Sequence, residues 1–457
     1  MKQPDFLEAI NAAAPEHGAV SYQGSLPFGD ALHIEAFELS SGLRILICED
    51  HSAPVLAFHT WFRIGSRHEQ PGKTGLAHLF EHLMFNETTS LAKGEFDRRL
   101  EGAGADSNAS TWLDWTQYNV AVPSGQLPVV IELESDRMAH LVLKAPQVES
   151  EIEVVANERR YRVEDDIDGA MSELLWATAF EKHAYRWPTI GWMADILAFT
   201  TEDCDAFYRS YYAPNNATVI VVGDVTVADV VERISQAYGK IGREQLPLEN
   251  NIPEPAQNGE RRVEIRKATA TDKISIGYHS PALGDYDYAP MNVLSQALLG
   301  GRASRLQKKL VREHEAASDA RIFLGPFRDP GLLEIYASAR TGKSAEDLLE
   351  IIDTELRALQ SEPLSCDELT RAKARMELGL YGSLETVDGK ANSIGFYEAV
   401  LQEPAAAFQR QQSLQRVTAS DVLRVARRYL NPENRSIVIV RPDSPDGEVS
   451  TAEDNHE

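Results

Sequence analysis

The sequence predicts an α+β protein built from two homologous domains, and three features lead to this prediction. The chain has 457 residues, 43% of them hydrophobic, which is more than one ordinary domain holds and enough to bury two cores. A stretch rich in proline, asparagine and glutamate divides the chain near its middle. A pattern of residues in the first half recurs in the second half at a constant distance.

The recurring pattern describes a helix start, a turn and a strand, and its two copies are 218 residues apart. The positions are Thr200, Asp203, Tyr211, Pro214, Asn216 and 218–222, repeated as Thr418, Asp421, Tyr429, Pro432, Asn434 and 436–440. Threonine three residues before aspartate is typical of a helix N-cap, Pro and Asn of a turn, and a β-branched run of a strand. A generic motif recurring by chance would not keep one offset over so many positions, so the pattern indicates duplication of an α+β unit.

Periodicity places further elements along the chain. In chain order, strands are predicted over 43–48 and 55–62, a helix over 148–160, a strand over 273–278, and helices over 345–359 and 366–381. Residues 243–259 lack apolar periodicity and indicate an exposed linker. The predicted domains are therefore 1–243 and 261–443, joined by a linker over 244–260 and followed by an acidic tail, 444–457, that frays in solvent.

The composition limits the kinds of binding partner and the cellular compartment that we expect for this protein. The formal charge of −25 argues against nucleic acid or an anionic membrane surface as the main partner. Cys48, Cys204 and Cys366 are too few and too scattered for a disulfide framework or a cysteine zinc cluster. The N-terminus has no apolar core of a signal peptide and no run is long enough to span a bilayer, so we expect a cytoplasmic protein, or a periplasmic one if the N-terminus has been processed or engineered.

The segment from His78 to His82 carries the strongest chemical signal in the chain. Residues four apart lie on one face of a helix, so both imidazoles can point at one metal ion with Glu81 beside them. This His-x-x-Glu-His order is the inverted form of the common zinc-peptidase motif. In such a site a carboxylate at position 81 is placed to act as general base toward a metal-activated water.

A catalytic zinc needs a third protein ligand, and Glu158 is the best candidate. It lies in the predicted helix over 148–160, seven residues after Glu151, so both carboxylates face the same side. Glu151 could then orient a ligand from behind the metal. The alternative is that both are solvated glutamates on a helix surface.

At this point the chain resembles the pitrilysin/insulinase family of zinc peptidases, and most closely its half-length branch, which includes the mitochondrial processing peptidase subunits and bacterial relatives. The resemblance rests on the run 75–85, on Glu158 following the second histidine by 76 residues, on Glu151 as the family's supporting glutamate, and on 102–111 with Tyr118. It implies two α/β-sandwich domains with mixed, mainly antiparallel sheets flanked by helices. It also implies one Zn²⁺ per chain, bound by His78, His82 and Glu158.

The resemblance further implies that an extended peptide substrate pairs with an exposed sheet edge near Asn108, Ala109 and Thr111. Asn108 is the residue that we expect to contact the substrate. An equally weighted alternative is that Asn108 holds a turn after the glycine-rich segment 102–104.

The second half departs from the family in one respect. Members usually supply an Arg and, six residues later, a Tyr that bind substrate; here Arg312 is present but position 318 is Ser, so Arg312 is better read as a helix-surface residue. We therefore expect a zinc metalloendopeptidase that cleaves oligopeptides or unfolded segments inside a clamshell chamber, as a heterodimer with a homologous subunit that lacks zinc ligands. A homodimer is the alternative assembly, and a catalytically weak assembly or peptide-binding subunit is the alternative function.

Overall fold

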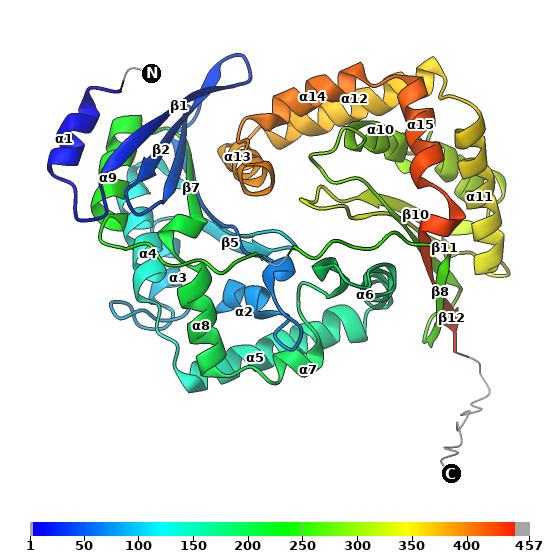
Figure 1. Cartoon of the computed structure of the whole chain (residues 1–457), viewed down its shortest axis with the longest axis horizontal. Coiled ribbons are helices and arrows are strands. Elements are labelled where there is room, and N and C mark those ends of the chain that lie inside the picture. The colour runs from blue at the N-terminus through cyan, green and yellow to red at the C-terminus, as the bar shows by residue number, and fades with distance from the viewer. Residues whose placement is uncertain (1–2, 250, 444–457) are drawn as a thin grey trace, which may run out of the picture.

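The computed structural model describes residues 3–249 and 251–443, which form two β-sheets flanked by helices (Figure 1). The first sheet has seven strands in the order β1-β2-β3-β7-β4-β6-β5, and the second has five in the order β10-β11-β9-β12-β8. Among the described strand pairs only β3 with β7 and β8 with β12 are parallel. The expected α+β class with mixed, mainly antiparallel sheets is confirmed. The acidic tail predicted for 444–457 lies outside the described residues.

The strands and helices have the following bounds. The strands are β1 (Val20–Phe28), β2 (Leu32–Leu39), β3 (Arg44–Glu49), β4 (Val55–Phe62), β5 (Asp106–Thr111), β6 (Thr116–Pro123), β7 (Ala217–Gly223), β8 (Arg261–Lys267), β9 (Lys273–His279), β10 (Ala317–Leu324), β11 (Leu332–Ala339) and β12 (Arg435–Pro442). The α-helices of the first half are α1 (Phe6–Ala12), α2 (Leu76–Leu83), α3 (Glu95–Gly102), α4 (Leu127–His140), α5 (Ala145–Arg159), α6 (Ile167–Ala179), α7 (Met193–Ile196), α8 (Thr201–Tyr211) and α9 (Val227–Tyr238). Those of the second half are α10 (Tyr288–Leu299), α11 (Ala345–Ser361), α12 (Cys366–Ser383), α13 (Val387–Leu401), α14 (Ala406–Arg416) and α15 (Ala419–Tyr429). Each element predicted from periodicity is present, within three residues of its expected bounds.

The repeated sequence pattern forms the same local structure twice. Thr200 caps α8 and Thr418 caps α15, each in a capping box with the aspartate three residues later. After each helix a one-turn segment follows, in which Asn216 donates its side-chain N–H to the carbonyl of Tyr211 and Asn434 donates to that of Tyr429. The strands β7 and β12 come next, so the repeat fixes a helix, a turn and a central strand in each half.

The duplication extends to the strand order. The strands β3-β7-β4-β6-β5 of the first sheet have the same order and the same directions as β8-β12-β9-β11-β10 of the second. The helix α2 follows β4 in the chain as α10 follows β9, but α10 contains no histidine. The first copy of the unit therefore carries the His-x-x-Glu-His motif, and the corresponding helix of the second copy does not.

The two halves exchange helices across the molecule. Helix α6 of the first half packs on the second sheet, where a side chain at Gly277 would meet Leu175 at about 3.2 Å. Helix α13 of the second half packs on the first sheet, where a Cβ at Gly395 would lie 2.1 Å from Nε1 of Trp61. Only glycine permits this approach, and a hydrogen bond of 2.9 Å between Nε2 of His59 and the Asp388 carboxylate joins the same two elements. Each sheet is thus completed by a helix from the other half.

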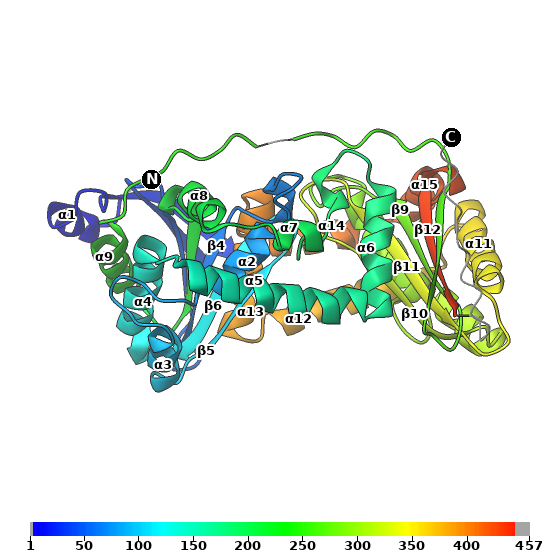
Figure 2. The same ribbon diagram turned by 90° about the horizontal axis from the view of Figure 1, so that it is seen from below.

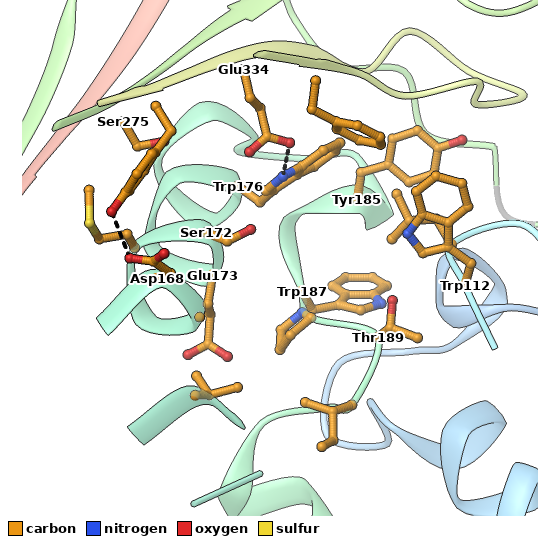
Figure 3. A pocket seen from close by; sticks show the side chains of 18 of the residues that line it. Trp112, Asp168, Ser172, Glu173, Trp176, Tyr185, Trp187, Thr189, Ser275 and Glu334 are labelled. Carbon is orange, nitrogen blue, oxygen red and sulfur yellow. Dashed lines mark hydrogen bonds between the residues drawn. The ribbon is translucent and has the colours of Figure 1, made fainter. Parts of the chain in front are cut away.

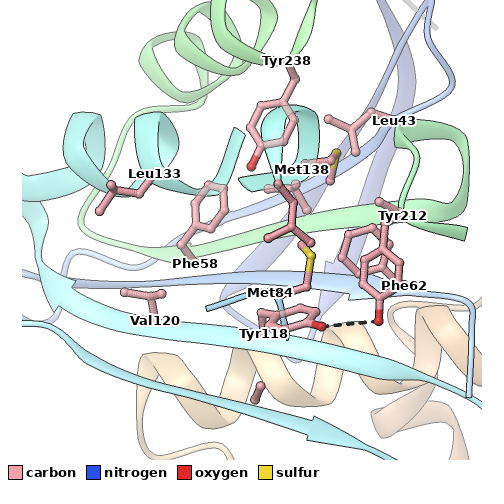
Figure 4. Packing of buried hydrophobic residues seen from close by; sticks show 14 of the residues in the cluster. Leu43, Phe58, Phe62, Met84, Tyr118, Val120, Leu133, Met138, Tyr212 and Tyr238 are labelled. Carbon is pink, nitrogen blue, oxygen red and sulfur yellow. Dashed lines mark hydrogen bonds between the residues drawn. The ribbon is translucent and has the colours of Figure 1, made fainter. Parts of the chain in front are cut away.

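The core of the first half fixes the strands that border the candidate site. Phe58, Phe62 and Tyr118 pack between the sheet and its helices, as Figure 4 shows, and the Tyr118 hydroxyl donates to the carbonyl of Phe80 in α2 at 2.8 Å. The guanidinium of Arg137 lies 4.3 Å from the centre of the Tyr118 ring and is held by a buried glutamate. Strand β6 and helix α2 are thereby packed as one rigid layer.

The segment between α9 and β8 forms neither helix nor strand in its described residues, as predicted for a linker. It runs along one side of the molecule from one half to the other (Figure 2). Polar contacts attach it: the Glu254 carboxylate accepts hydrogen bonds from three consecutive backbone N–H groups beginning at Glu181, and Arg67 donates to Asn251 at 2.8 Å. The domain limits themselves stay a prediction.

None of the helices in residues 3–249 and 251–443 combines the length and the apolar character that a bilayer span requires.

Candidate metal centre

Helix α2 presents the two histidines, and its start is fixed by a buried turn. Gly75 has φ of 99°, and a Cβ there would lie 2.5 Å from the carbonyl oxygen of Ile190, so glycine is required at this position. The Glu69 carboxylate accepts hydrogen bonds from the backbone N–H groups of Gly75 and Ala77 at 2.8 and 2.7 Å. Burial raises the pKa of Glu69 to about 8 against the lowering effect of these two bonds. The first turn of the helix is therefore anchored from outside.

The three predicted ligands converge. Nε2 of His78 lies 3.7 Å and Nε2 of His82 lies 3.4 Å from Oε2 of Glu158, and all three ligand atoms fall within 4.8 Å of one another. Two atoms bonded to one tetrahedral zinc at about 2.0 Å are roughly 3.3 Å apart. The spacing fits a zinc ion at the centre of the three.

The two oxygens of the Glu158 carboxylate have different surroundings. Its Oε1 pairs with Nε of Arg162 at 3.0 Å, whereas the buried Oε2 accepts no hydrogen bond of good geometry from the described residues. A buried polar atom without a partner is costly, and a metal ion would satisfy it. The donor set and this oxygen both fit a divalent ion bound by histidine and carboxylate.

The charges of the site suit metal binding. Burial lowers the pKa of His78 to about 4, so its imidazole is neutral, the form that binds metals. Contact with His82 lowers the pKa of Glu158 and keeps it a carboxylate. Burial lowers the pKa of His82, but its contact with Glu158 and the charges of Glu81 and Glu151 raise it above the usual value. Zinc binds the neutral imidazole, so zinc binding would compete with protonation of His82.

Glu81 is a half-buried residue of α2 that faces the edge strand β5. Burial raises its pKa, while hydrogen bonds from the side chain and backbone of Thr111 and the charge of His82 lower it. A general base is most effective when its pKa approaches the working pH. Glu81 is not one of the predicted zinc ligands, and its carboxylate faces β5.

Glu151 lies behind His82, where the prediction put it. Its Oε2 is 4.0 Å from Nδ1 of His82, the ring nitrogen that faces away from the candidate metal position. At 4.0 Å the Glu151 carboxylate makes no direct hydrogen bond to this nitrogen, but its charge can orient the imidazole, and such partners typically contribute about ten- to hundred-fold to metal affinity.

We expect Glu151→Gln to weaken zinc binding by about ten- to hundred-fold, because it removes the charge that orients His82. Competition with a chromogenic chelator measures this affinity. The matched control is Glu153→Gln, an exposed glutamate on the same helix. Equal affinities for the two variants would remove Glu151 from the site.

Arg159 is a buried residue of the site that sequence reasoning missed. Its guanidinium forms two hydrogen bonds with the Glu173 carboxylate, at 2.7 and 2.9 Å, and one with the carbonyl of Gly191 at 2.8 Å. Arg159 thereby connects the end of α5, where Glu158 lies, to α6. It also connects this end to the loop at Gly191, which packs against Gly75. An arginine in a charged helix carries no sequence signal of such a role, because its partners are 14 and 32 residues away.

The predicted substrate contacts lie on β5, the edge strand of the first sheet. Asn108 is exposed, Ala109 is buried and Thr111 is half-buried against Glu81. Asn108 lies inside the strand, and its side-chain oxygen accepts the N–H of Ala109 at 2.9 Å, so it does not hold the preceding turn. The strand offers an open edge beside the metal-binding helix.

Arg312 and Ser318 lie in the second half. Arg312 is exposed in a one-turn π-helical segment, Gln307–Glu313, as expected for a helix-surface arginine. Ser318 is on β10, the edge strand of the second sheet, and donates its hydroxyl to the carbonyl of Ser338 at 3.2 Å. These two residues lie outside the cluster formed by His78, His82 and Glu158.

Comparisons with known proteins show similarity to a family of peptidases. Residues 44–191 match the family described as insulinase (peptidase family M16), and residues 198–376 match the peptidase M16 inactive domain. The zinc protease PqqE of Helicobacter pylori is 30% identical over 413 residues, 89% of this chain and 93% of that protein. The mitochondrial-processing peptidase subunit beta of Lentinula edodes is 23% identical, with 92% of both chains covered. A crystal structure of a protease from Helicobacter pylori superposes with a TM-score of 0.86 at 30% identity, covering 90% of this chain and 99% of that one.

Proposed function

Because the chain belongs to peptidase family M16, the insulinase family, we propose that it is a zinc metalloendopeptidase that hydrolyses oligopeptides or unfolded segments. One observation carries the proposal: Nε2 of His78, Nε2 of His82 and Oε2 of Glu158 converge on one point beside Glu81. The inverted His-x-x-Glu-His order puts His78, Glu81 and His82 on α2, and α5 contributes Glu158.

The residues of the chain divide the chemistry among them. Bound zinc would supply Lewis-acid activation of water and of the scissile carbonyl. Glu81 would accept a proton from the attacking water at a carboxylate oxygen and pass it to the leaving amine, and Thr111 of β5 lies beside that carboxylate. The open edge of β5 would bind the peptide backbone, which tolerates many side chains.

Removal and return of the metal test this proposal. We expect the purified chain to cleave quenched fluorescent peptides, to lose this activity on dialysis against a chelator, and to regain it with one equivalent of zinc. Magnesium is the control ion, because it prefers oxygen ligands in octahedral geometry to imidazole. Cleavage that survives complete zinc removal would refute the assignment.

We further propose that the active form is a pair of homologous subunits that enclose a chamber, with this chain contributing the zinc and a partner without zinc ligands contributing Arg and Tyr. The support is the serine at position 318 and the similarity to a protein named as a subunit. A homodimer is the other assembly to be tested. Activity of the chain alone that equals its activity in every mixture with candidate partners would refute the heterodimer.

A second candidate function is an assembly or peptide-binding subunit with little catalysis. The match of residues 198–376 to a domain described as inactive favours it, although the metal-binding helix lies in the other matched region. Zinc stoichiometry near zero, together with peptide binding but no cleavage, would support this second candidate over the first.

A further inference from the structure

The segment 65–69 lies between β4 and α2 and contacts both parts of the proposed site. At its end, the Glu69 carboxylate accepts the hydrogen bonds that fix the first turn of the metal-binding helix. At its start, the backbone N–H of Ser66 donates to the carbonyl of Trp112 at 3.1 Å, in the turn that joins β5 to β6. One short segment therefore connects α2 to the end of the edge strand that is expected to pair with substrate.

The contact between this segment and the turn is close. A Cβ at Gly65 would lie 2.4 Å from the carbonyl oxygen of Trp112, so glycine is required there. Nε1 of Trp187 donates to the carbonyl of Ser66 at 2.7 Å and holds the segment from the other side. Trp112 and Trp187 both line the cavity between α6 and the second sheet (Figure 3). The position of the turn therefore depends on the position of the segment.

The side chain of Arg67 joins this turn to the second half of the chain. It is 5% exposed, and its Nη2 donates to the Asp329 carboxylate at 2.7 Å, in the turn between β10 and β11. Its Nε lies 3.6 Å from the Asp114 carboxylate, in the turn between β5 and β6. Asn251 and Glu249 of the linker lie 2.8 and 3.7 Å from the guanidinium. Arg67 thus lies where four segments of the chain meet.

The two aspartates share further donors with one another. The buried Asp114 carboxylate accepts hydrogen bonds from the Tyr185 hydroxyl at 2.8 Å and from the backbone N–H of Arg328 at 3.0 Å. The backbone N–H of Asp329 donates to the same Tyr185 hydroxyl at 3.2 Å. Two carboxylates brought together away from water are costly unless a cation accompanies them. Arg67 is the buried cation that contacts both, and it keeps the turn and the second half together.

The strand β5 depends on such an attachment. It is the edge strand of the first sheet and pairs with β6, so its other edge is open. Thr111 is the last residue of β5, lies beside the Glu81 carboxylate and directly precedes the turn. A shift of the turn would therefore move the open edge relative to Glu81 and to the metal-binding helix. Misplacement of a substrate by about 1 Å can cost about a hundred-fold in rate.

We propose that Arg67 is a positioning residue of the site: it holds the turn after β5, and with it the substrate-binding edge, in a fixed place relative to the metal-binding helix. The inference rests on the proposed peptidase function and adds a residue that acts through this turn. The segment 65–69 performs two tasks, because Arg67 fixes the edge strand and Glu69 fixes the helix. Loss of Arg67 should therefore weaken peptide binding and leave zinc binding intact.

The variant Arg67→Gln tests this role against a matched control. Arg435→Gln removes another arginine that is 5% exposed and is bound by two carboxylates, Glu260 and Asp353, but lies on β12 in the second half. Both variants break buried ion pairs, so both should unfold at a lower temperature than the unchanged chain. Peptide affinity is measured by fluorescence anisotropy of a labelled decapeptide, on zinc-loaded protein that also carries Glu81→Gln. We expect Arg67→Gln to bind about ten-fold or more weakly and Arg435→Gln to stay within about two-fold.

Kinetics and hydrogen exchange locate the effect within the molecule. With Glu81 intact, kcat/KM of Arg67→Gln should fall about ten- to hundred-fold, mainly through KM, because the zinc ligands and the general base are unchanged. Amide hydrogen exchange should become faster in the segment 65–69 and in the turn after β5, whereas α2 should keep its protection. Arg435→Gln should leave exchange at both places unchanged.

Two further variants keep the test complete if Arg67→Gln does not fold. Arg67→Lys keeps the charge, but a single ammonium replaces the fork that contacts both carboxylates, so we expect an intermediate peptide affinity. Asp329→Asn weakens the shortest contact of Arg67 at a carboxylate that is 30% exposed, and we expect peptide affinity to fall about two- to five-fold.

The outcomes separate this role from general stability and from the peptidase function. Peptide affinity and hydrogen exchange that stay unchanged in the variants of Arg67 and Asp329 would overturn the positioning role. An equal loss of peptide affinity in Arg435→Gln would also overturn it, because general destabilisation would then explain the effect. Peptide binding that depends on Arg67, in a chain that never cleaves, would instead overturn the peptidase proposal and leave this role standing.

Discussion

Glu81→Gln should bind zinc as tightly as the unchanged chain and cleave peptides about a thousand-fold more slowly or worse. The amide keeps the size of the side chain and can still bond Thr111, but it cannot accept a proton from water. General acid–base catalysis by one group typically contributes a hundred- to ten-thousand-fold in rate. Single-turnover kinetics with zinc content measured on the same sample give both quantities.

Two further variants show whether the loss of activity in Glu81→Gln comes from loss of the general base. Glu101→Gln changes an exposed glutamate on α3 and should leave kcat and zinc content unchanged. Glu81→Asp keeps the charge but withdraws it from the edge strand, and we expect an intermediate rate. A Glu81→Gln enzyme that retains most of its kcat would assign the proton transfer to another group.

Glu158→Gln should abolish tight zinc binding. The substitution removes the charged member of the three predicted ligands, and a neutral amide binds zinc more weakly than a carboxylate. We expect zinc affinity to fall by about a hundred-fold or more and peptide cleavage to disappear at stoichiometric zinc. Isothermal titration of the zinc-free protein measures the affinity, and excess zinc should restore part of the cleavage.

The neighbouring charges supply the control for Glu158. Glu164→Gln removes an exposed carboxylate from the segment that follows α5 and should not change zinc affinity. Arg162→Gln frees Oε1 of Glu158 without removing the ligand oxygen, and its effect should be less than about ten-fold. Loss of zinc in all three variants alike would indicate a general disturbance of this segment and not loss of a ligand.

The sequence alone predicted the features that rest on repeated local hydrogen bonds. It also predicted those, such as metal binding, for which only a few residue types are suitable. The capped helix, the Asn-anchored turn and the central strand appear twice because the same hydrogen bonds recur, from Asn216 to Tyr211 and from Asn434 to Tyr429. The histidines of α2 could be placed on one face from their spacing alone. Glu158 lies on a second helix that contacts α2, and the pattern of the residues around Glu158 predicted that helix.

The remaining features depend on contacts between distant segments. The exchange of α6 and α13 between the two sheets follows from close packing at Gly277 and Gly395, and a glycine inside a helix or strand does not name its partner. Arg159 holds the end of α5 through Gly191, 32 residues away, which only the fold brings close. The cavity between α6 and the second sheet is lined by Trp112, Trp176 and Trp187 from three separate segments, and each of these looks locally like an ordinary packing residue.

Anomalous diffraction at the zinc edge, from crystals of the chain prepared with one equivalent of zinc, tests the central claim most directly. The account predicts a single strong peak about 2.0 Å from Nε2 of His78, Nε2 of His82 and Oε2 of Glu158. No peak at this position, or a zinc ion bound by other residues while these three remain paired with one another, would contradict it.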